Sequence, residues 1–133
     1  MKTLIAILTV IIVIGFSECK SSDKTDDKGL AKLEFNETEF DFGNIRAGEK
    51  VAHRFIFKNI GNGNLIIKDV DPSCGCTVAS FPNTPIKPGE GSFIDITFDS
   101  EGYRGLSIKE IDVFSNSRPA EVKLTISATI EKN

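Results

Sequence analysis

The sequence is poor in the residues on which most enzymes depend. It has one histidine, His53, and three cysteines among 133 residues, and it lacks tryptophan. A Ser-His or Cys-His catalytic pair would have to use His53, which falls on the inward face of an expected strand and is more typical of a structural residue. The sequence has no G-x-S-x-G motif and no phosphate-binding glycine loop. We therefore expect that the protein is not an enzyme.

Other shortages in composition limit the classes of partner. One tyrosine and no tryptophan leave few aromatic side chains for a carbohydrate-binding platform. The net charge is −3 and the isoelectric point about 5.2, with basic residues scattered along the chain, so nucleic acid is not an expected partner. Ten phenylalanines suit the core of a β-sheet instead, together with the β-branched residues.

The first residues have the layout of an export signal. Lys2 is followed by an uncharged apolar run over residues 4–16, which is too short to cross a bilayer but fits the apolar region of a signal peptide. Cys19 stands directly behind this run and resembles the lipid-bearing cysteine of bacterial lipoproteins, although Glu18 departs from the small residue of that motif. We predict a lipoprotein signal peptide over residues 1–18 and lipidation of Cys19. An uncleaved anchor and an ordinary secretory signal are the alternatives.

Lipidation of Cys19 would also explain the odd number of cysteines, because it leaves a single pair. Residues 19–32 are polar and charged and cannot bury enough apolar surface to fold, so we expect a flexible tether there. Its Ser/Asp-rich start resembles the surface-export signals of Bacteroidota lipoproteins. We therefore expect an exported protein anchored to the cell envelope by its lipid, at the outer membrane, so that the membrane is its first partner.

Residues 33–133 read as one all-β domain. Turn residues recur at short intervals and divide this part into about seven short strands with no good helix. The clearest alternation of apolar residues runs from Val122 to Ile130. This pattern predicts an immunoglobulin-like antiparallel β-sandwich. The Cys…Trp…Cys signature of antibody domains is absent, so packing alone must hold the core.

Some strands can be described more closely. Leu65–Val70 is rich in apolar residues and is expected to be a central strand, whereas Thr77–Phe81 suits a short edge strand. Gly43 is expected to end the opening element of the domain. Between Ile108 and Ile111 the apolar positions change parity, which predicts a β-bulge.

Several phrases of the domain fall in an order typical of one family. They are Phe40-Asp41-Phe42-Gly43, Phe55-Ile56-Phe57-Lys58-Asn59-Ile60-Gly61, Asp71-Pro72-Ser73-Cys74-Gly75-Cys76-Thr77 and Pro85-Ile86-Lys87-Pro88-Gly89-Glu90-Gly91. Together they resemble the DUF1573 family, immunoglobulin-like domains common in Bacteroidota and related to the ASPM/SPD-2/hydin group. The Ser-Cys-Gly-Cys-Thr stretch followed by Pro-x-x-Pro-Gly is the specific part. The resemblance implies the sandwich fold and an envelope location, and it assigns no function.

The Cys74-Gly75-Cys76 stretch is the one chemically distinctive motif. Two thiolates could hold a soft cation such as Cu(I), but a zinc or iron–sulfur site needs more ligands than this chain offers, so we expect no cofactor. Outside the cytoplasm the pair could close a disulfide and serve redox exchange, although no Lys, Arg or His within the motif would activate a thiolate. The interpretation we favour is structural, with both cysteines shaping a tight loop.

Two functional hypotheses remain open. The first is an envelope-anchored binding or scaffolding module that presents loops or a sheet edge to another envelope protein. The second is a thiol redox or copper-handling protein that uses Cys74 and Cys76. Under the first hypothesis, replacing both cysteines by serine leaves partner capture intact. Under the second, thiol titration finds an accessible, easily cycled pair.

Overall fold

The structure is a computed structural model that describes residues 29–132. Eight strands and no helix occur in this range. The strands are β1 (Leu33–Phe35), β2 (Glu39–Arg46), β3 (Lys50–Asn59), β4 (Ile67–Pro72), β5 (Thr77–Ser80), β6 (Gly91–Asp99), β7 (Gly105–Ser115) and β8 (Glu121–Glu131). Among the described residues no helix is long and apolar enough to cross a membrane. The predicted signal peptide, Cys19 and most of the predicted tether lie outside the described residues.

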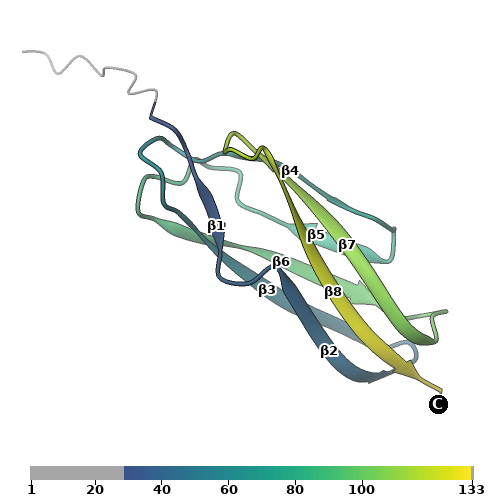
Figure 1. The fold of residues 1–133 in the computed structure, drawn as a ribbon. Helices are drawn as coiled ribbons and strands as arrows, with labels where there is room; N and C mark the ends of the chain where they lie inside the picture. Colours follow the sequence, from purple (N-terminus) through teal and green to yellow (C-terminus); the bar gives the residue numbers. More distant parts are fainter. Residues whose placement is uncertain (1–28, 133) are drawn as a thin grey trace, which may run out of the picture.

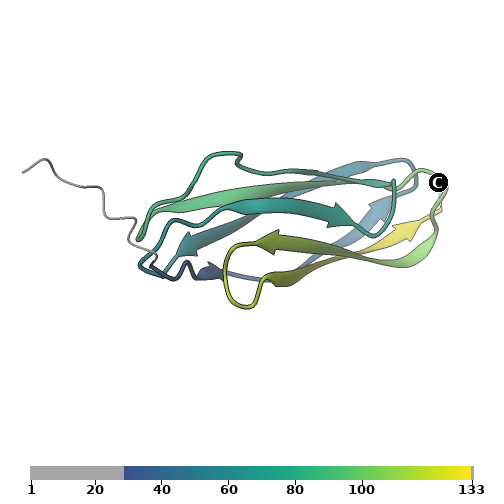
Figure 2. The same ribbon diagram turned by 90° about the horizontal axis from the view of Figure 1, so that it is seen from above.

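The strands form two four-stranded sheets that pack face to face (Figure 1). Sheet A has the order β1-β3-β6-β5 and sheet B the order β2-β8-β7-β4. Neighbouring strands are antiparallel except β2 and β8, which run parallel. Figure 2 shows the two layers from above, with the long strands roughly aligned. The predicted immunoglobulin-like β-sandwich is confirmed.

The structure has one strand more than the sequence indicated, and it arises at the start of the domain. β1 pairs with β3 in sheet A; the chain then crosses, and β2 pairs with β8 in sheet B. At the crossing, Thr125 N donates to the carbonyl of Thr38 at 2.8 Å. β1 and β2 show the same alternation of apolar and polar residues in the sequence, yet they are edge strands of different sheets.

Alternating apolar side chains fill the space between the sheets. Phe55 and Phe57 of β3, Ile94 and Ile96 of β6, and Leu124 of β8 have no solvent-exposed surface and belong to one cluster. Burying a side chain of this size stabilises a fold by roughly 1.5–3 kcal/mol relative to leaving it exposed. The cluster extends through both sheets, so the domain has a single core.

One expectation about strand position is wrong and another is confirmed. Leu65–Val70 is not a central strand, because β4 begins at Ile67 and lies at the edge of sheet B, where β7 is the one strand of residues 29–132 that pairs with it. Leu65 is buried all the same, since it forms an isolated bridge with Ile86. The expected edge strand is present as β5, at the edge of sheet A.

Two expectations about strand irregularity are also wrong. Gly43 does not end β2; with a φ of 70° it lies where the register against β8 shifts, and the strand continues to Arg46. β7 has no bulge, because its pairing with β8 is continuous over the whole strand. The apolar parity changes there because Ile108 faces solvent, with 58% of its surface exposed.

The folded part of the chain begins before Leu33, so the predicted tether is too long. Ala31 is buried in the core, and Ile60 N donates to the carbonyl of Lys32 at 2.9 Å. The approach is so close that a Cβ at Gly61 would come within 2.6 Å of Lys32 N. Glycine is therefore required in the loop after β3, and residues 29–32 belong to the domain.

The two ends of the sandwich differ. The first described residues lie at one end and the C terminus at the other (Figure 1). At the C-terminal end, the Ser100 hydroxyl donates to the carbonyl of Glu49 at 2.7 Å, and the carbonyl oxygen of Arg46 lies 3.1 Å from the same hydroxyl. Beside them, Asp99 N donates to the carbonyl of Cys76 at 2.9 Å. The β4–β5 loop thus lies at the end opposite to the one where the chain enters.

Candidate functional site

The predicted Cys-Gly-Cys motif forms the loop between β4 and β5. A disulfide joins Cys74 to Cys76, whose Cα atoms are 5.3 Å apart. Both cysteines are half-buried, and the hydroxyl of the buried Thr77 lies 3.7 Å from the sulfur of Cys74 and 3.8 Å from that of Cys76. Cys76 also packs against the hydrophobic core. The motif is therefore a bridged turn that leads directly into β5.

Backbone contacts tie this loop to both sheets. Asp99 N donates to the carbonyl of Cys76, which holds the start of β5 against β6. On the other side Ser73 bonds Glu110 of β7 twice: Ser73 N donates to the Glu110 carbonyl at 2.9 Å, and Glu110 N donates to the Ser73 hydroxyl at 3.3 Å. The loop is thus part of the architecture at this end of the sandwich.

A cation that the sequence analysis did not single out lies at the same end. Lys109 of β7 shares its strand face with the buried Ile111, and its Nζ lies 4.0 Å from the centroid of the Tyr103 ring. The same Nζ is 5.9 Å from the ring of Phe98. Ammonium groups are attracted to aromatic faces, typically by about 0.5–1 kcal/mol at accessible sites. Lys109 therefore helps to close the end of the sandwich between the sheets.

His53 has the inward-facing position that the sequence predicted. Its ring stacks on that of Phe40, with centroids 3.5 Å apart and planes 8° from parallel. The plane of the His53 ring is nearly perpendicular to the ring planes of Phe42 and Phe55, at 85° in both cases. Its Nε2 lies 2.7 Å from Glu37 Oε1, in the segment where the chain crosses between the sheets. Through these contacts His53 has a structural role: it packs against the segment in which the chain crosses from β1 to β2.

The described residues contain no group of three or more His, Cys, Asp or Glu side chains that could hold a metal ion. Asp69 and Asp71 are exposed on β4, while Asp95 and Asp99 lie on the outer side of β6 and pair with cations. The absence of a cofactor stays a prediction for the chain as a whole.

The outer face of sheet B presents a different kind of candidate. Leu106 and Ile108 of β7 are 69% and 58% exposed although both are large and apolar. Ile108 pairs across the sheet with Ser127, which pairs in turn with Asp41 of β2. We name this surface the Ile108 face and define it by Leu106, Ile108, Thr125, Ser127, Glu39 and Asp41.

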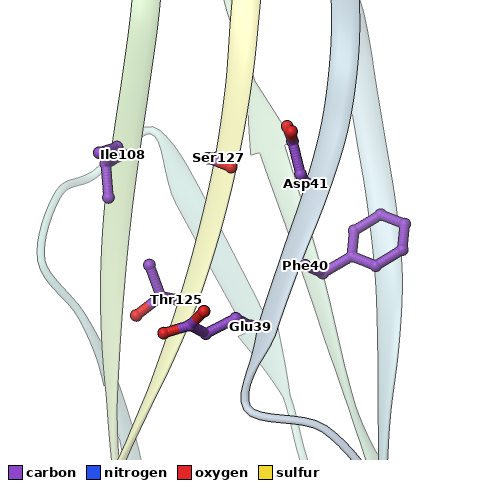
Figure 3. Close-up of a pocket in the computed structure, with 6 residues that line it drawn as sticks. All are labelled: Glu39, Phe40, Asp41, Ile108, Thr125 and Ser127. Carbon is purple, nitrogen blue, oxygen red and sulfur yellow. The ribbon is translucent and has the colours of Figure 1, made fainter.

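Figure 3 shows how these side chains lie. Ile108 comes from β7, Thr125 and Ser127 from β8, and the Glu39 carboxylate reaches from β2 toward Thr125, while Phe40 points away to the interior. The small β8 residues form the floor of a shallow hollow of about 470 Å³, open to solvent. Because neighbouring strands are about 4.8 Å apart, the apolar and acidic walls stand roughly 10 Å apart.

The acidic wall of the Ile108 face is not neutralised within the part of the chain that the structure describes. Neither Glu39 nor Asp41 has a cation within salt-bridge distance there. Asp41 Oδ1 accepts a hydrogen bond from Gly43 N at 2.9 Å and leaves its other oxygen to solvent. The face therefore combines an aliphatic wall with a negatively charged one.

The outer face of sheet A also exposes apolar side chains, Ile56 at 49% and Val78 at 66%, but it shields its aromatic one. Phe93 is 41% exposed, but the guanidinium carbon of Arg54 lies 3.6 Å from its ring centroid. Arg54 in turn donates two hydrogen bonds to Asp95, at 2.7 and 2.9 Å. The hydrogen bond from Arg54 is the main reason that the pKa of Asp95 is lowered, and the same bond raises the pKa of Arg54. Sheet A thus covers Phe93 with an ion pair, whereas Leu106 and Ile108 of sheet B are neighbours on one strand face with no such cover.

Residues 33–130 match the family described as "Protein of unknown function (DUF1573)". The chain belongs to the DUF1573 family. The resemblance carried by the four sequence phrases is thereby confirmed. The family description assigns no activity, and no curated protein matches the chain.

Solved structures agree with the fold. A protein of unknown function from Porphyromonas gingivalis W83 superposes with a TM-score of 0.66 at 23% identity, over 75% of this chain and 47% of its own. The ASH/PapD-like domain 7 of human CEP192 gives 0.59 at 15% identity, over 77% and 87%. The secreted serine protease VesC from Vibrio cholerae gives 0.57 at 16%, over 75% and 23%. The chain spans about half the length of the Porphyromonas protein and a quarter of VesC. At these identities the likeness shows the fold alone.

Of the residues that the sequence analysis named as candidate sites, the structure brings one pair into contact. Cys74 and Cys76 meet in a disulfide, while Cys19 lies outside the described residues. The Ile108 face was missed, because an alternating pattern was expected to keep apolar residues inside. The signal that would have found it is the parity change at Ile108, which marks an aliphatic residue on the solvent side rather than a bulge.

Proposed function

We propose that the protein is an exported binding or scaffolding module of the cell envelope, and that it binds another envelope protein through the Ile108 face. The observation that carries the proposal is the pair of exposed aliphatic side chains, Leu106 and Ile108, on a continuously paired strand. Contiguous exposed apolar surface beside polar residues is typical of protein interaction sites. A β-sheet holds these side chains in place before binding, which lowers the entropic cost of association.

The likeness to an ASH/PapD-like domain supports a module without catalysis, although fold alone does not assign function. The acidic wall formed by Glu39 and Asp41 favours a partner with basic residues next to aliphatic ones. Such a partner would place a cation over the acids and an apolar side chain against Ile108.

A photocrosslinking experiment tests this proposal. p-Benzoylphenylalanine would replace Ile108 in the full chain, in the cells that produce it. The matched control carries it at Val78, which is 66% exposed on the edge strand of sheet A. We expect an adduct with a second kind of protein from position 108 and none from position 78. Equal adducts from both positions, or none with another protein from position 108, would refute the proposal.

We further propose that Cys19 carries the lipid that anchors the module. The apolar run over residues 4–16 and the position of Cys19 directly behind it support this. Cys19→Ala should abolish incorporation of a labelled fatty acid and move the protein out of the membrane fraction. Retained label, or an unchanged membrane fraction, would contradict lipidation at this residue.

The disulfide gives one reason to keep a second candidate, a thiol redox or copper-handling function. Cys74 and Cys76 are bridged at the end of the domain remote from the chain entry, and both are partly accessible. Alkylation and mass spectrometry of the purified protein, before and after graded reduction and with Cu(I) added, separate the candidates. A pair that cycles under mild reduction or holds copper tightly supports the second candidate. Inert cysteines, together with partner capture by a Cys→Ser double variant, support the first.

A further inference from the structure

Four segments of the domain meet at the end of the sandwich where the chain enters (Figure 1). They connect or precede strands whose ends lie there. The segments are residues 29–32, the β3–β4 loop over residues 60–66, residues 86–90 before β6, and the β7–β8 loop over residues 116–120. We name these four segments the entry loops.

Hydrogen bonds fix the entry loops relative to one another. Asn62 N donates to the carbonyl of Leu30 at 3.1 Å, which joins the first two segments. The Asn116 side chain accepts from Ile66 N at 2.8 Å and donates to the carbonyl of Asn64 at 2.9 Å, which joins the β7–β8 loop to the β3–β4 loop. The bridge to residue 86 described above joins the remaining segment. A surface whose backbone is fixed beforehand loses little entropy when it docks.

The entry loops expose three aliphatic side chains. Leu30 is 54% exposed, Ile60 40% and Ile66 43%. Exposed apolar side chains gathered at one place on a domain are typical of a contact with a protein or with a membrane. The charges around them distinguish the two.

Cations accompany these aliphatic side chains. The entry loops carry Lys32, Lys87 and Arg118, all exposed, against one acid, Glu90, although the chain as a whole has a net charge of −3. None of the three cations forms an ion pair within residues 29–132. Aliphatic side chains next to Lys and Arg are the usual composition of a surface that docks on anionic lipid headgroups.

The length of chain before the domain also favours the membrane. Cys19 lies ten residues before Gly29, and ten residues span at most about 36 Å even when fully extended. A lipid on Cys19 would therefore keep the entry loops within that distance of the bilayer in every orientation of the domain. The longest strands have 11 residues, so the opposite end of the sandwich can lie about 35 Å further away.

We propose that the entry loops dock on the lipid bilayer that holds the lipid of Cys19. Their aliphatic side chains enter the headgroup boundary, and their cations contact anionic headgroups. The inference rests on the proposed lipid anchor and goes beyond it, because it gives the folded domain a contact of its own with the membrane. Tethering raises the local concentration of the bilayer, so a small contact is enough. An anionic bilayer would repel Glu39 and Asp41, so the Ile108 face stays available to a protein.

Tryptophan fluorescence tests the docking, because the chain has no tryptophan of its own. The full lipidated chain with Ile60→Trp would be reconstituted into phosphatidylcholine vesicles with about 30% phosphatidylglycerol, with and without brominated acyl chains. We expect brominated lipids to quench about half of the emission. Val78→Trp is the matched control. Val78 is 66% exposed and pairs with Thr97 near the far end of β6, so a tryptophan there should not be quenched.

A second pair of variants tests the contribution of charge. On the Ile60→Trp background, Arg118→Glu reverses one of the three cations and should weaken docking about fivefold, read as a loss of quenching. Arg104→Glu makes the same change on an exposed residue at the opposite end, directly before β7, and should leave the quenching unchanged.

The outcomes separate the docking from the anchor. A chain that floats with the vesicles but is not quenched at position 60 overturns the docking and leaves the anchor intact. Equal quenching at positions 60 and 78 overturns it too, and so does quenching that Arg118→Glu does not reduce. A chain that does not float overturns the anchor and the docking together. Leu30→Trp is a second probe at the same end if circular dichroism shows that Ile60→Trp is unfolded. None of these results depends on crosslinking from position 108.

Discussion

Replacing Asn59 by alanine should remove an unusually large share of the stability of this domain. Asn59 is fully buried at the end of β3, and its Nδ2 donates to the carbonyls of Gly63 and Ile86 at 2.7 and 2.9 Å. Its Oδ1 accepts from Lys32 N at 3.3 Å and from Gly61 N at 3.0 Å. One side chain thus satisfies backbone groups of the first described segment, the β3–β4 loop and the segment before β6.

The magnitude follows from these four bonds. A buried group that loses its partner typically costs about 1–3 kcal/mol, and partly accessible groups cost less, so we expect Asn59→Ala to lower the free energy of unfolding by about 3–5 kcal/mol. A domain of this size is stable by roughly 5–15 kcal/mol, and 1 kcal/mol shifts its melting temperature by about 4–8 °C. The melting temperature should therefore fall by about 12–40 °C.

Asn59→Asp offers a sharper test, because it keeps the shape of the side chain. The introduced carboxyl would keep the acceptor for Lys32 and Gly61 but would face two carbonyl oxygens. Burial and those carbonyls favour its protonated form, so its pKa should rise above the ordinary value of about 3.9. The folded state then binds more protons than the unfolded state, and stability should fall as the pH rises above about 4.

Thermal and urea unfolding followed by circular dichroism, from about pH 3 to pH 8, would measure both variants. Asn83→Asp adds the same charge in an exposed loop and is the matched control; it should leave the melting temperature within about 2 °C of the parent. A loss below about 1 kcal/mol for Asn59→Ala, or an Asn59→Asp variant whose stability relative to this control does not depend on pH, would refute the account of Asn59 as a shared anchor.

Further predictions concern the core, the disulfide and the surface. Phe55→Ala should lower the free energy of unfolding by about 3–5 kcal/mol in urea titrations, and a loss under about 1 kcal/mol would contradict its full burial. The Cys74→Ser, Cys76→Ser double variant should lose only about 1–2 kcal/mol, because so small a ring restricts the unfolded chain little; failure to fold would show that the loop organises the end of the sandwich. Asp95→Asn should lower the melting temperature at pH 7, since Arg54 lowers the pKa of Asp95 and the carboxylate therefore stabilises the fold above its ordinary pKa. The difference from the parent should shrink as the pH falls below about 4, and a difference that persists at low pH would contradict this origin.

Much of the fold could be predicted because alternation is a local property. The inward positions of β3 and β8 follow from side-chain parity alone, and the turn after Arg46 follows from its glycine and charges. The DUF1573 phrases gain a physical meaning in the structure. The Asn59 side chain accepts a hydrogen bond from Gly61 N, two residues later in the loop after β3. At Gly61 the absence of a Cβ lets the backbone of Leu30 and Lys32 pass close by, so both residues of the phrase have a structural reason.

What could not be predicted depends on pairing between distant strands. Parity shows which face a residue takes, but not that β1 and β2 lie in different sheets or that β4 lies at an edge. Ile108 is the clearest case. The rule that apolar residues face inward turned one exposed isoleucine into an expected bulge, and only the continuous register of β7 with β8 shows that it lies on the surface.

The parallel pairing of β2 with β8 has a mechanical consequence. Both strands run toward the C-terminal end, and the chain enters at the opposite end (Figure 1). Tension applied between the two termini would draw β2 and β8 in opposite directions along their length. The backbone hydrogen bonds between them, from Glu39 to Arg46, would then carry the load together instead of opening one after another. A domain held at its N terminus and pulled at the far end should therefore resist stretching better than one pulled across an antiparallel hairpin.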